Sequence, residues 1–140
     1  MESIIQTDEL MSRFVQEYFD AWSGTDEDTI LAYYSPDVVL QIPRVKLEGK
    51  IAVRDQFVRP FIAAFPGNLH IPQRMAFTEN LVAVEWIFQA THTGAFGSLA
   101  ATGRKISIPG ASFYEHDLEH EVITAGRIYF DFEAFLKELA

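Results

Sequence analysis

Residues 81–93 read LVAVEWIFQATHT, a long and strongly apolar stretch. Side chains of a strand alternate between its two faces, so the even-numbered positions share one face. That face carries Val82, Val84, Trp86, Phe88, Ala90 and His92. The opposite face carries Glu85, Gln89, Thr91 and Thr93. The stretch therefore predicts a strand whose apolar face, ending in one histidine, is turned towards packed helices.

The segments around this strand predict the rest of a sheet. Residues 38–42, 69–78, 104–116 and 121–131 have the apolar alternation and the flanking turn residues of strands. The pair Pro109-Gly110 predicts a bulge that interrupts one of them and bends the sheet. The same side-chain parity selects further residues for the apolar face, namely Leu40, Ile42, Ser112, Tyr114, Ile128 and Phe130.

Helices are predicted mainly before the sheet. Residues 8–23 have apolar residues at helical spacing, with Thr7 as the predicted N-cap, and a short second helix follows. Residues 51–65 predict a helix that Pro60 breaks or kinks, and 132–139 predict a terminal helix. Helices followed by an antiparallel meander indicate an α+β fold. A curved sheet with helices on its concave side leaves room for a cavity.

The composition limits the class of protein. The 140 residues suit one domain, 1–140, and 12 Phe, 5 Tyr and 2 Trp are consistent with a cavity that has aromatic walls. A net charge of −9 disfavours nucleic acids and anionic membranes as partners. The absence of cysteine excludes disulfides and thiolate chemistry. The sequence has neither a signal peptide pattern nor an apolar run long enough to span a membrane, so a cytoplasmic protein is expected.

Several phrases of the sequence together carry a family resemblance. In chain order they are FDAWSGTDED, YYSPDVVLQIP, LEGKIAVRDQF, AAFPG, VAVEWIFQATHTGAFGS, TGRKISIPGASFYE and GRIYFDFEAFLKELA. The sequence resembles the SnoaL-like polyketide and ester cyclases, part of the nuclear transport factor 2-like superfamily. The resemblance implies a cone-shaped, curved antiparallel β-sheet wrapped around N-terminal helices, often dimeric through the outer sheet face. The superfamily includes cyclases, isomerases, epoxide hydrolases, dehydratases and non-catalytic proteins, so function depends on the site.

This chain departs from the family at the positions that the resemblance makes catalytic. The acid/base aspartate of SnoaL-like cyclases falls on Ile128, and a pocket histidine of those enzymes falls on Tyr114. A positioned general acid or base contributes about 10²–10⁴ in rate, which an isoleucine cannot supply. The Tyr, Asn, Arg and Asp of the superfamily's epoxide hydrolases fall on apolar residues: Leu40, Ile42, Trp86 and Phe88. Epoxide hydrolysis by that mechanism is not expected.

Three polar residues remain as catalytic candidates. His92 matches a histidine common in the family's Thr-His-Thr-Gly phrase and could shuttle a proton, although a hydrogen-bonded core histidine would look the same. Tyr114 could donate a hydrogen bond to a developing oxyanion, or bond to a backbone carbonyl within the core. Asp131 could reach the rim of the pocket, or act as the N-cap of the terminal helix.

The predicted pocket wall is mostly apolar and aromatic. The predicted substrate-binding residues are Trp22, Tyr34, Leu40, Ile42, Phe57, Phe61, Trp86, Phe88, Ser112, Ile128 and Phe130. No cofactor is predicted, because the sequence contains no nucleotide-binding loop and no nucleophile elbow. No metal is predicted either, because there is no zinc motif and His70, His116 and His120 are scattered along the chain.

Two main functions are compatible with this reading. The leading hypothesis is a SnoaL-like enzyme for the cofactor-free cyclisation, isomerisation or elimination of a hydrophobic, polyketide- or terpene-like small molecule. The alternative is a non-catalytic domain that binds an apolar ligand, and Ile128 is the reason for it. A third possibility is an assembly module, which a pocket too small for one ring would favour. The resemblance implies a homodimer, and the mixed face of Glu85, Ile87, Gln89 and Thr91 would suit its interface.

Overall fold

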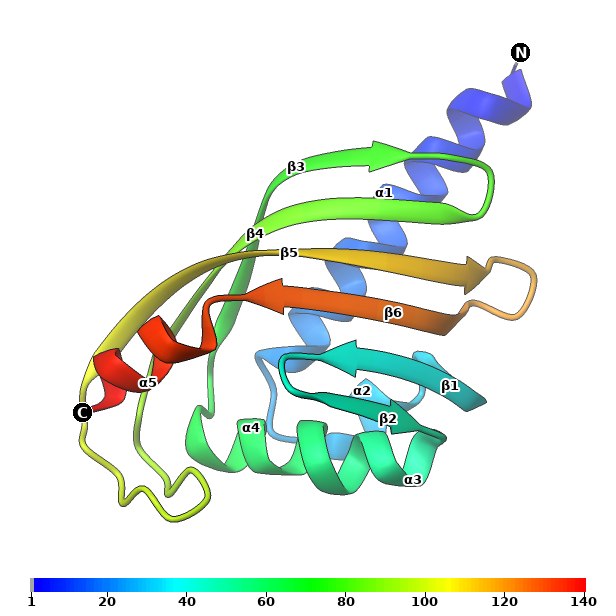
Figure 1. Cartoon of the computed structure of the whole chain (residues 1–140). Helices are drawn as coiled ribbons and strands as arrows, with labels where there is room; N and C mark the ends of the chain where they lie inside the picture. The colour runs from blue at the N-terminus through cyan, green and yellow to red at the C-terminus, as the bar shows by residue number, and fades with distance from the viewer. Residues whose placement is uncertain (1) are drawn as a thin grey trace.

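The chain forms an α+β structure with helices at its N-terminus and a six-stranded, curved, open sheet, as the sequence predicted (Figure 1). This computed structural model describes residues 2–140, with side chains described from residue 8 onwards. The helices are α1 (Glu2–Trp22), α2 (Glu27–Leu31), α3 (Lys50–Val53), α4 (Arg59–Ala64) and α5 (Phe132–Leu139), with a π-helical turn η1 (Arg54–Val58). The strands are β1 (Tyr34–Ile42), β2 (Val45–Glu48), β3 (Leu69–Phe77), β4 (Leu81–Thr91), β5 (Lys105–Asp117) and β6 (Val122–Phe130).

Helix α1 begins earlier than the sequence pattern suggested. It starts at Glu2, so the predicted N-cap Thr7 lies within the helix, and the Thr7 side chain is outside the described part of the chain. Its buried residues recur at the spacing of one helical face: Met11, Phe14, Val15, Tyr18, Phe19 and Trp22. Figure 1 shows this helix crossing one face of the sheet, so these side chains form one wall of the core.

Pro60 breaks the third helical segment as predicted, and the break takes the form of a π-helical turn. Pro60 has no backbone N–H and lies in the first turn of α4, where that donor is not needed. Immediately before it, the Arg59 N–H donates to the Arg54 carbonyl, which is the wider bonding pattern of a π turn. Phe57 and Phe61 flank this point, and their ring centroids are 5.3 Å apart.

The sheet has the strand order β2-β1-β6-β5-β4-β3. Strands β3 to β6 form the predicted antiparallel meander. Strand β1 pairs with β6 in parallel, and the hairpin that joins β1 to β2 was not predicted. Its turn contains Pro43 and places Arg44 at a positive φ of 74°. The helices pack on the concave face, and α5 lies at one end of it (Figure 1).

The predicted bulge at Pro109-Gly110 is wrong. Strand β5 pairs with β4 in one unbroken register from Glu115 to Lys105, and Gly110 lies opposite Trp86. The glycine is required by space, because a Cβ at this position would overlap the indole of Trp86. The sheet is irregular at other points, including the β3–β4 register between Pro72 and Arg74. Within the described residues, no helix has both the length and the apolar character needed to cross a membrane.

Candidate functional site

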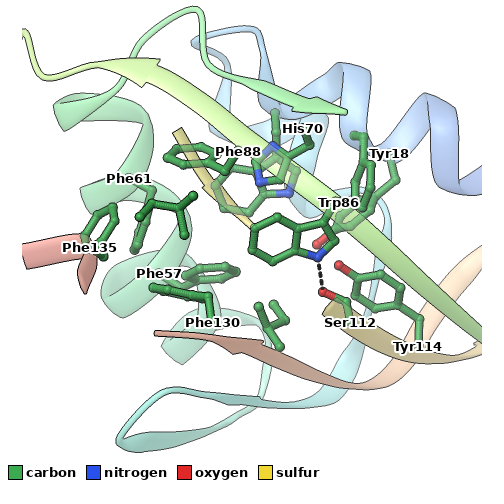
Figure 2. A pocket seen from close by; sticks show the side chains of 14 residues that line it. Tyr18, Phe57, Phe61, His70, Trp86, Phe88, Ser112, Tyr114, Phe130 and Phe135 are labelled. Carbon is green, nitrogen blue, oxygen red and sulfur yellow. Dashed lines mark hydrogen bonds between the residues drawn. The ribbon is translucent and has the colours of Figure 1, made fainter. Parts of the chain in front are cut away.

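A pocket lies between the concave face of the sheet and the helices (Figure 2). Fourteen residues line it: Tyr18, Phe19, Trp22, Phe57, Phe61, His70, Trp86, Phe88, Ile108, Ser112, Tyr114, Ile128, Phe130 and Phe135. The hollow measures about 510 Å³ including its mouth, but only about 40 Å³ can hold the centres of water-sized molecules. One water needs about 10–15 Å³ of this inner volume, so the pocket has room for a few waters. A ring-sized ligand therefore requires aromatic side chains to move.

Strand parity and helix spacing predicted most of this wall. The predicted residues that line the pocket are Trp22, Phe57, Phe61, Trp86, Phe88, Ser112, Tyr114, Ile128 and Phe130. Tyr34, Leu40 and Ile42 are buried but do not line it. Leu40 and Ile42 lie on β1, which is separated from β5 and β4 by β6. The lining therefore comes from β4, β5, β6 and the helices, with His70 from β3, and not from β1.

The hydroxyl-bearing side chains of Tyr18, Ser112 and Tyr114 lie at one end of the pocket, and those of Phe57, Phe61 and Phe135 lie at the other (Figure 2). His70 lies beside Phe88, between the two ends. The Trp86 indole N–H donates to Ser112 Oγ at 2.8 Å. Because the indole can only donate, the Ser112 hydroxyl keeps its own hydrogen for another acceptor. The Tyr114 ring meets the Tyr18 ring edge-on, with centroids 5.5 Å apart. This end therefore carries hydroxyl groups, whereas the rest of the lining, His70 apart, is aromatic or aliphatic.

The two tyrosines of this end are held in their protonated form. The Tyr18 and Tyr34 hydroxyls hydrogen-bond each other in the core behind the pocket. Burial raises the pKa of Tyr18 and of Tyr114 well above the usual value, because a phenolate would lose its hydration there. At neutral pH both phenols therefore act as hydrogen-bond donors or acceptors and not as bases.

His70 is a pocket residue that sequence reasoning missed. Its imidazole lies within 4.9–5.9 Å, centroid to centroid, of four aromatic side chains: Phe19, Trp22, Trp86 and Phe88. Burial alone lowers its pKa to about 3, so the ring is neutral at physiological pH. Nδ1 is buried and has no hydrogen-bond partner within the described chain. The β3–β4 pairing places His70 opposite Phe88, and the register shift between Pro72 and Arg74 hides this from simple alternation along the sequence.

His92 lies outside the pocket, although it has the predicted inward parity. It follows the end of β4, is fully buried and packs against Phe65 at 5.5 Å. Its Nδ1 accepts from the Thr102 N–H at 3.3 Å and lies 3.0 Å from the Thr102 hydroxyl. Its backbone N–H donates to the Arg104 carbonyl. These bonds join the two ends of the loop between β4 and β5, and they match the alternative of a hydrogen-bonded core histidine.

Asp131 is the N-cap of α5, the second of its two predicted roles. Its carboxylate accepts from the Ala134 N–H at 2.9 Å, and its side chain is not part of the pocket lining. The helix that it starts brings Phe135 into the pocket, where its ring stacks on Phe61 with centroids 6.0 Å apart. Asp131 therefore shapes the pocket through α5 and does not touch its interior.

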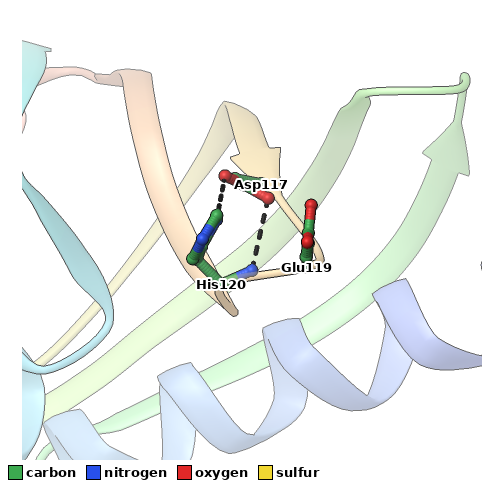
Figure 3. A group of neighbouring side chains, drawn as sticks. All are labelled: Asp117, Glu119 and His120. Atoms are coloured by element: carbon green, nitrogen blue, oxygen red, sulfur yellow. Dashed lines mark hydrogen bonds and ion pairs between the residues drawn. The ribbon is translucent and has the colours of Figure 1, made fainter.

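The turn between β5 and β6 holds a group of potential metal ligands, Asp117, Glu119 and His120 (Figure 3). His120 Nδ1 lies 2.6 Å from Asp117 Oδ2, and the His120 backbone N–H donates to Asp117 Oδ1 at 3.2 Å. The imidazole contact lowers the pKa of the Asp117 carboxyl below its usual value. These hydrogen bonds within the exposed turn account for the closeness of the three side chains without a metal ion. His70, His116 and His120 do not come together.

Comparison with known proteins adds the family. The model of the SnoaL-like domain matches residues 15–125, which is most of the chain. The chain belongs to the SnoaL-like domain family. No match was found among curated proteins.

Solved structures show the same fold as this SnoaL-like domain. A candidate polyketide cyclase from Xanthomonas campestris pv. campestris superposes with a TM-score of 0.80 at 18% identity, covering 94% of this chain and 98% of that one. Another from Acidithiobacillus ferrooxidans gives 0.72 at 23% identity, covering 94% and 92%. A protein with a ketosteroid isomerase-like fold from Catenulispora acidiphila, in complex with trimethylamine, gives 0.73 at 15% identity, covering 90% and 91%. At these identities the likeness is one of fold.

Ile128, which stands where the family resemblance implies an aspartate, lies in the pocket wall of this SnoaL-like domain. It is the cross-strand partner of Ser112. The position at which the resemblance implies an aspartate is therefore an apolar part of the wall in this SnoaL-like domain. Proton transfer in this pocket would have to use one of the neutral groups around it, and the described lining contains His70, Ser112, Tyr18 and Tyr114 for that purpose.

Proposed function

We propose that the pocket binds a neutral, ring-containing small molecule and catalyses its cyclisation, isomerisation or elimination without a cofactor. The observation that carries the proposal is the lining itself. Among the described residues that form it, none has a side chain charged at neutral pH, and the three hydroxyl groups are gathered at one end. A charged ligand would lose its hydration in this pocket without gaining an ionic partner. An uncharged ring has a much smaller hydration free energy to lose, so the pocket favours it.

The arrangement of the wall supports a specific orientation of that ligand. Phe57, Phe61 and Phe135 would hold the hydrocarbon part, and the end with Ser112 and Tyr114 would receive an oxygen atom. The Tyr114 phenol stays protonated because burial raises its pKa, and in this proposal it would donate a hydrogen bond to a carbonyl oxygen that becomes negative during enolisation. Aromatic walls that hold the substrate in its reactive shape contribute to the rate without any acid or base.

A non-catalytic binding domain is the second candidate. It is favoured by Ile128, which replaces the acid/base group that the family resemblance implies. The small free space of the pocket instead favours the third possibility, an assembly module. The two candidates differ in what happens to the ligand. An enzyme releases a changed molecule, whereas a binding domain returns the same one.

The experiment is a capture and conversion assay with neutral fused-ring phenols and ketones, read by chromatography and mass spectrometry. The wild type is expected to retain and convert at least one of them, and Tyr114→Phe should slow conversion by about 10²–10³. Ile128→Trp fills the pocket and should abolish retention, which makes it the matched control. Retention without conversion supports the binding domain. Equal retention by the wild type and Ile128→Trp would contradict both candidates.

We also propose a homodimer through the outer face of the sheet. This face carries an aromatic pair, Phe113 and Tyr129, whose centroids are 6.0 Å apart, and Tyr129 is 52% exposed. Tyrosine and phenylalanine are enriched in the cores of protein interfaces. Light scattering should give twice the monomer mass for the wild type, and Tyr129→Asp should reduce it towards the monomer. A monomeric wild type at micromolar concentration would contradict this proposal.

A further inference from the structure

His70 has a polar ring in surroundings that call for an apolar one. The four aromatic side chains around it approach to between 4.9 and 5.9 Å, and Phe88 is both the nearest of them and its cross-strand partner. Packing alone would be served equally well by phenylalanine. A buried nitrogen without a partner carries a free-energy penalty, so its presence is not explained by the fold.

The His70 imidazole also has no hydrogen-bond partner at Nδ1 within the described chain. Burial is the sole cause of its lowered pKa, and neither a charge nor a hydrogen bond contributes. A neutral imidazole carries one N–H donor and one lone pair. Whichever of the two Nδ1 carries is therefore available to a molecule in the pocket.

We propose that His70 is a specificity-determining residue whose ring nitrogens hydrogen-bond a hydroxyl group on the ligand. The ligand class is then a hydroxylated neutral ring, such as a phenol or an enol, rather than a plain hydrocarbon. This inference rests on the proposed function, because it needs the pocket to admit a ring. A hydroxyl suits the site because it can donate to the lone pair or accept from the N–H, whichever nitrogen is protonated.

The chain supplies its own matched control for this inference. His116 is a second buried histidine with no hydrogen-bond partner for either ring nitrogen among the described residues. Burial lowers its pKa as well, but it lies against Phe14, at 6.5 Å, and does not line the pocket. A change that acts only because a buried imidazole is lost should appear in both variants. A change that acts through the ligand should appear in the His70 variant alone.

The experiment compares two probes of similar size, toluene and phenol, whose dissociation constants are measured by NMR titration. The ratio of the toluene constant to the phenol constant removes effects common to both rings. We expect this ratio to fall about tenfold in His70→Phe, since a lost hydrogen bond in a buried site costs about that factor. It should stay within about twofold of the wild type in His116→Phe. His70→Leu serves as a second variant without ring nitrogens, and His70→Gln should keep part of the preference.

The outcomes separate this inference from the proposed function. Toluene binding with an unchanged ratio in His70→Phe and His70→Leu would overturn the role of His70 and leave the pocket intact. An equal fall in the His116→Phe ratio would overturn it too, because the effect would then come from the general loss of a buried imidazole. Failure of toluene itself to bind the wild type would overturn the proposed function, and the role of His70 with it.

Discussion

Trp86 and Gly110 are direct cross-strand partners, and the indole of Trp86 lies over the space that a side chain at position 110 would occupy. The absence of a Cβ lets the indole lie flat enough to donate its N–H to Ser112 at 2.8 Å. Trp86 and Ser112 both line the pocket. One glycine in the middle of a central strand therefore sets the position of one of the two tryptophans that line the site.

Gly110→Ala should disturb the pocket and the fold together. The added Cβ would overlap the indole, so Trp86 must rotate and lose its bond to Ser112. We expect a loss of about 1–3 kcal/mol in the free energy of unfolding, measured by urea denaturation. Gly24→Ala is the control, because a Cβ there meets only the Ala21 carbonyl at an ordinary 3.4 Å. Equal stability of the two variants would contradict the account of Gly110.

Asp131→Ala should lower stability without removing a group from the pocket. The N-cap bond to the Ala134 N–H is lost, which costs about 1 kcal/mol. Ligand binding should change far less than in Ile128→Trp, at a temperature where both variants are folded. Thermal unfolding and NMR titration measure the two effects. Loss of binding in fully folded Asp131→Ala, with α5 intact by NMR, would restore a direct role for this carboxylate.

The hydroxyls of Tyr18 and Tyr34 should be energetically coupled. They bond each other in the core, so removal of one leaves the other without its partner. Each single change to phenylalanine should cost about 1–2 kcal/mol, and the double change should cost less than the sum. Denaturation of the two single variants and the double variant gives the coupling free energy. Strictly additive losses would show that the two hydroxyls do not depend on each other.

His70 should make stability depend on pH in a way that His70→Phe removes. Its folded pKa, about 3, lies below the ordinary value of 6.5, so the unfolded chain takes up the proton first as pH falls. The contribution of the neutral His70 to the free energy of unfolding is fully present above about pH 6.5 and is lost progressively below it. From pH 7 to pH 5 the wild type should lose about 1–2 kcal/mol more than His70→Phe. Parallel pH profiles of the two proteins would contradict a buried neutral imidazole.

The position of His70 shows where sequence reasoning stops. Met75 and Phe77 point inward from β3, and simple alternation from them would turn His70 outward. The register shift between Pro72 and Arg74 reverses the parity, so that His70 lies opposite inward-facing Phe88. A one-residue shift of this kind leaves no clear mark in the sequence. The pair Pro109-Gly110 predicted a bulge, but the β4–β5 register is regular there. Glycine is found at position 110 because the Trp86 indole occupies the space of a Cβ.

Features that depend on local chemistry were predictable. The terminal helix, its Asp131 cap and the break at Pro60 follow from hydrogen-bonding rules that act within a few residues. The aromatic wall followed from alternation along an unbroken strand, as at Trp86 and Phe88. His92 has the predicted parity but does not line the pocket. Parity predicts which face of the sheet a side chain is on, but not whether its position along the strand lies beside the pocket.

The most direct test of a pocket for neutral rings uses the Trp86 indole N–H as a reporter. The chain has 2 Trp, so the Trp86 signal in a ¹H–¹⁵N spectrum is assigned by its loss in Trp86→Phe. Titration with toluene should shift this signal until it saturates, whereas benzoate, a ring of similar width with a negative charge, should leave it in place. A shift with benzoate equal to that with toluene, or no shift with toluene, would contradict the central claim.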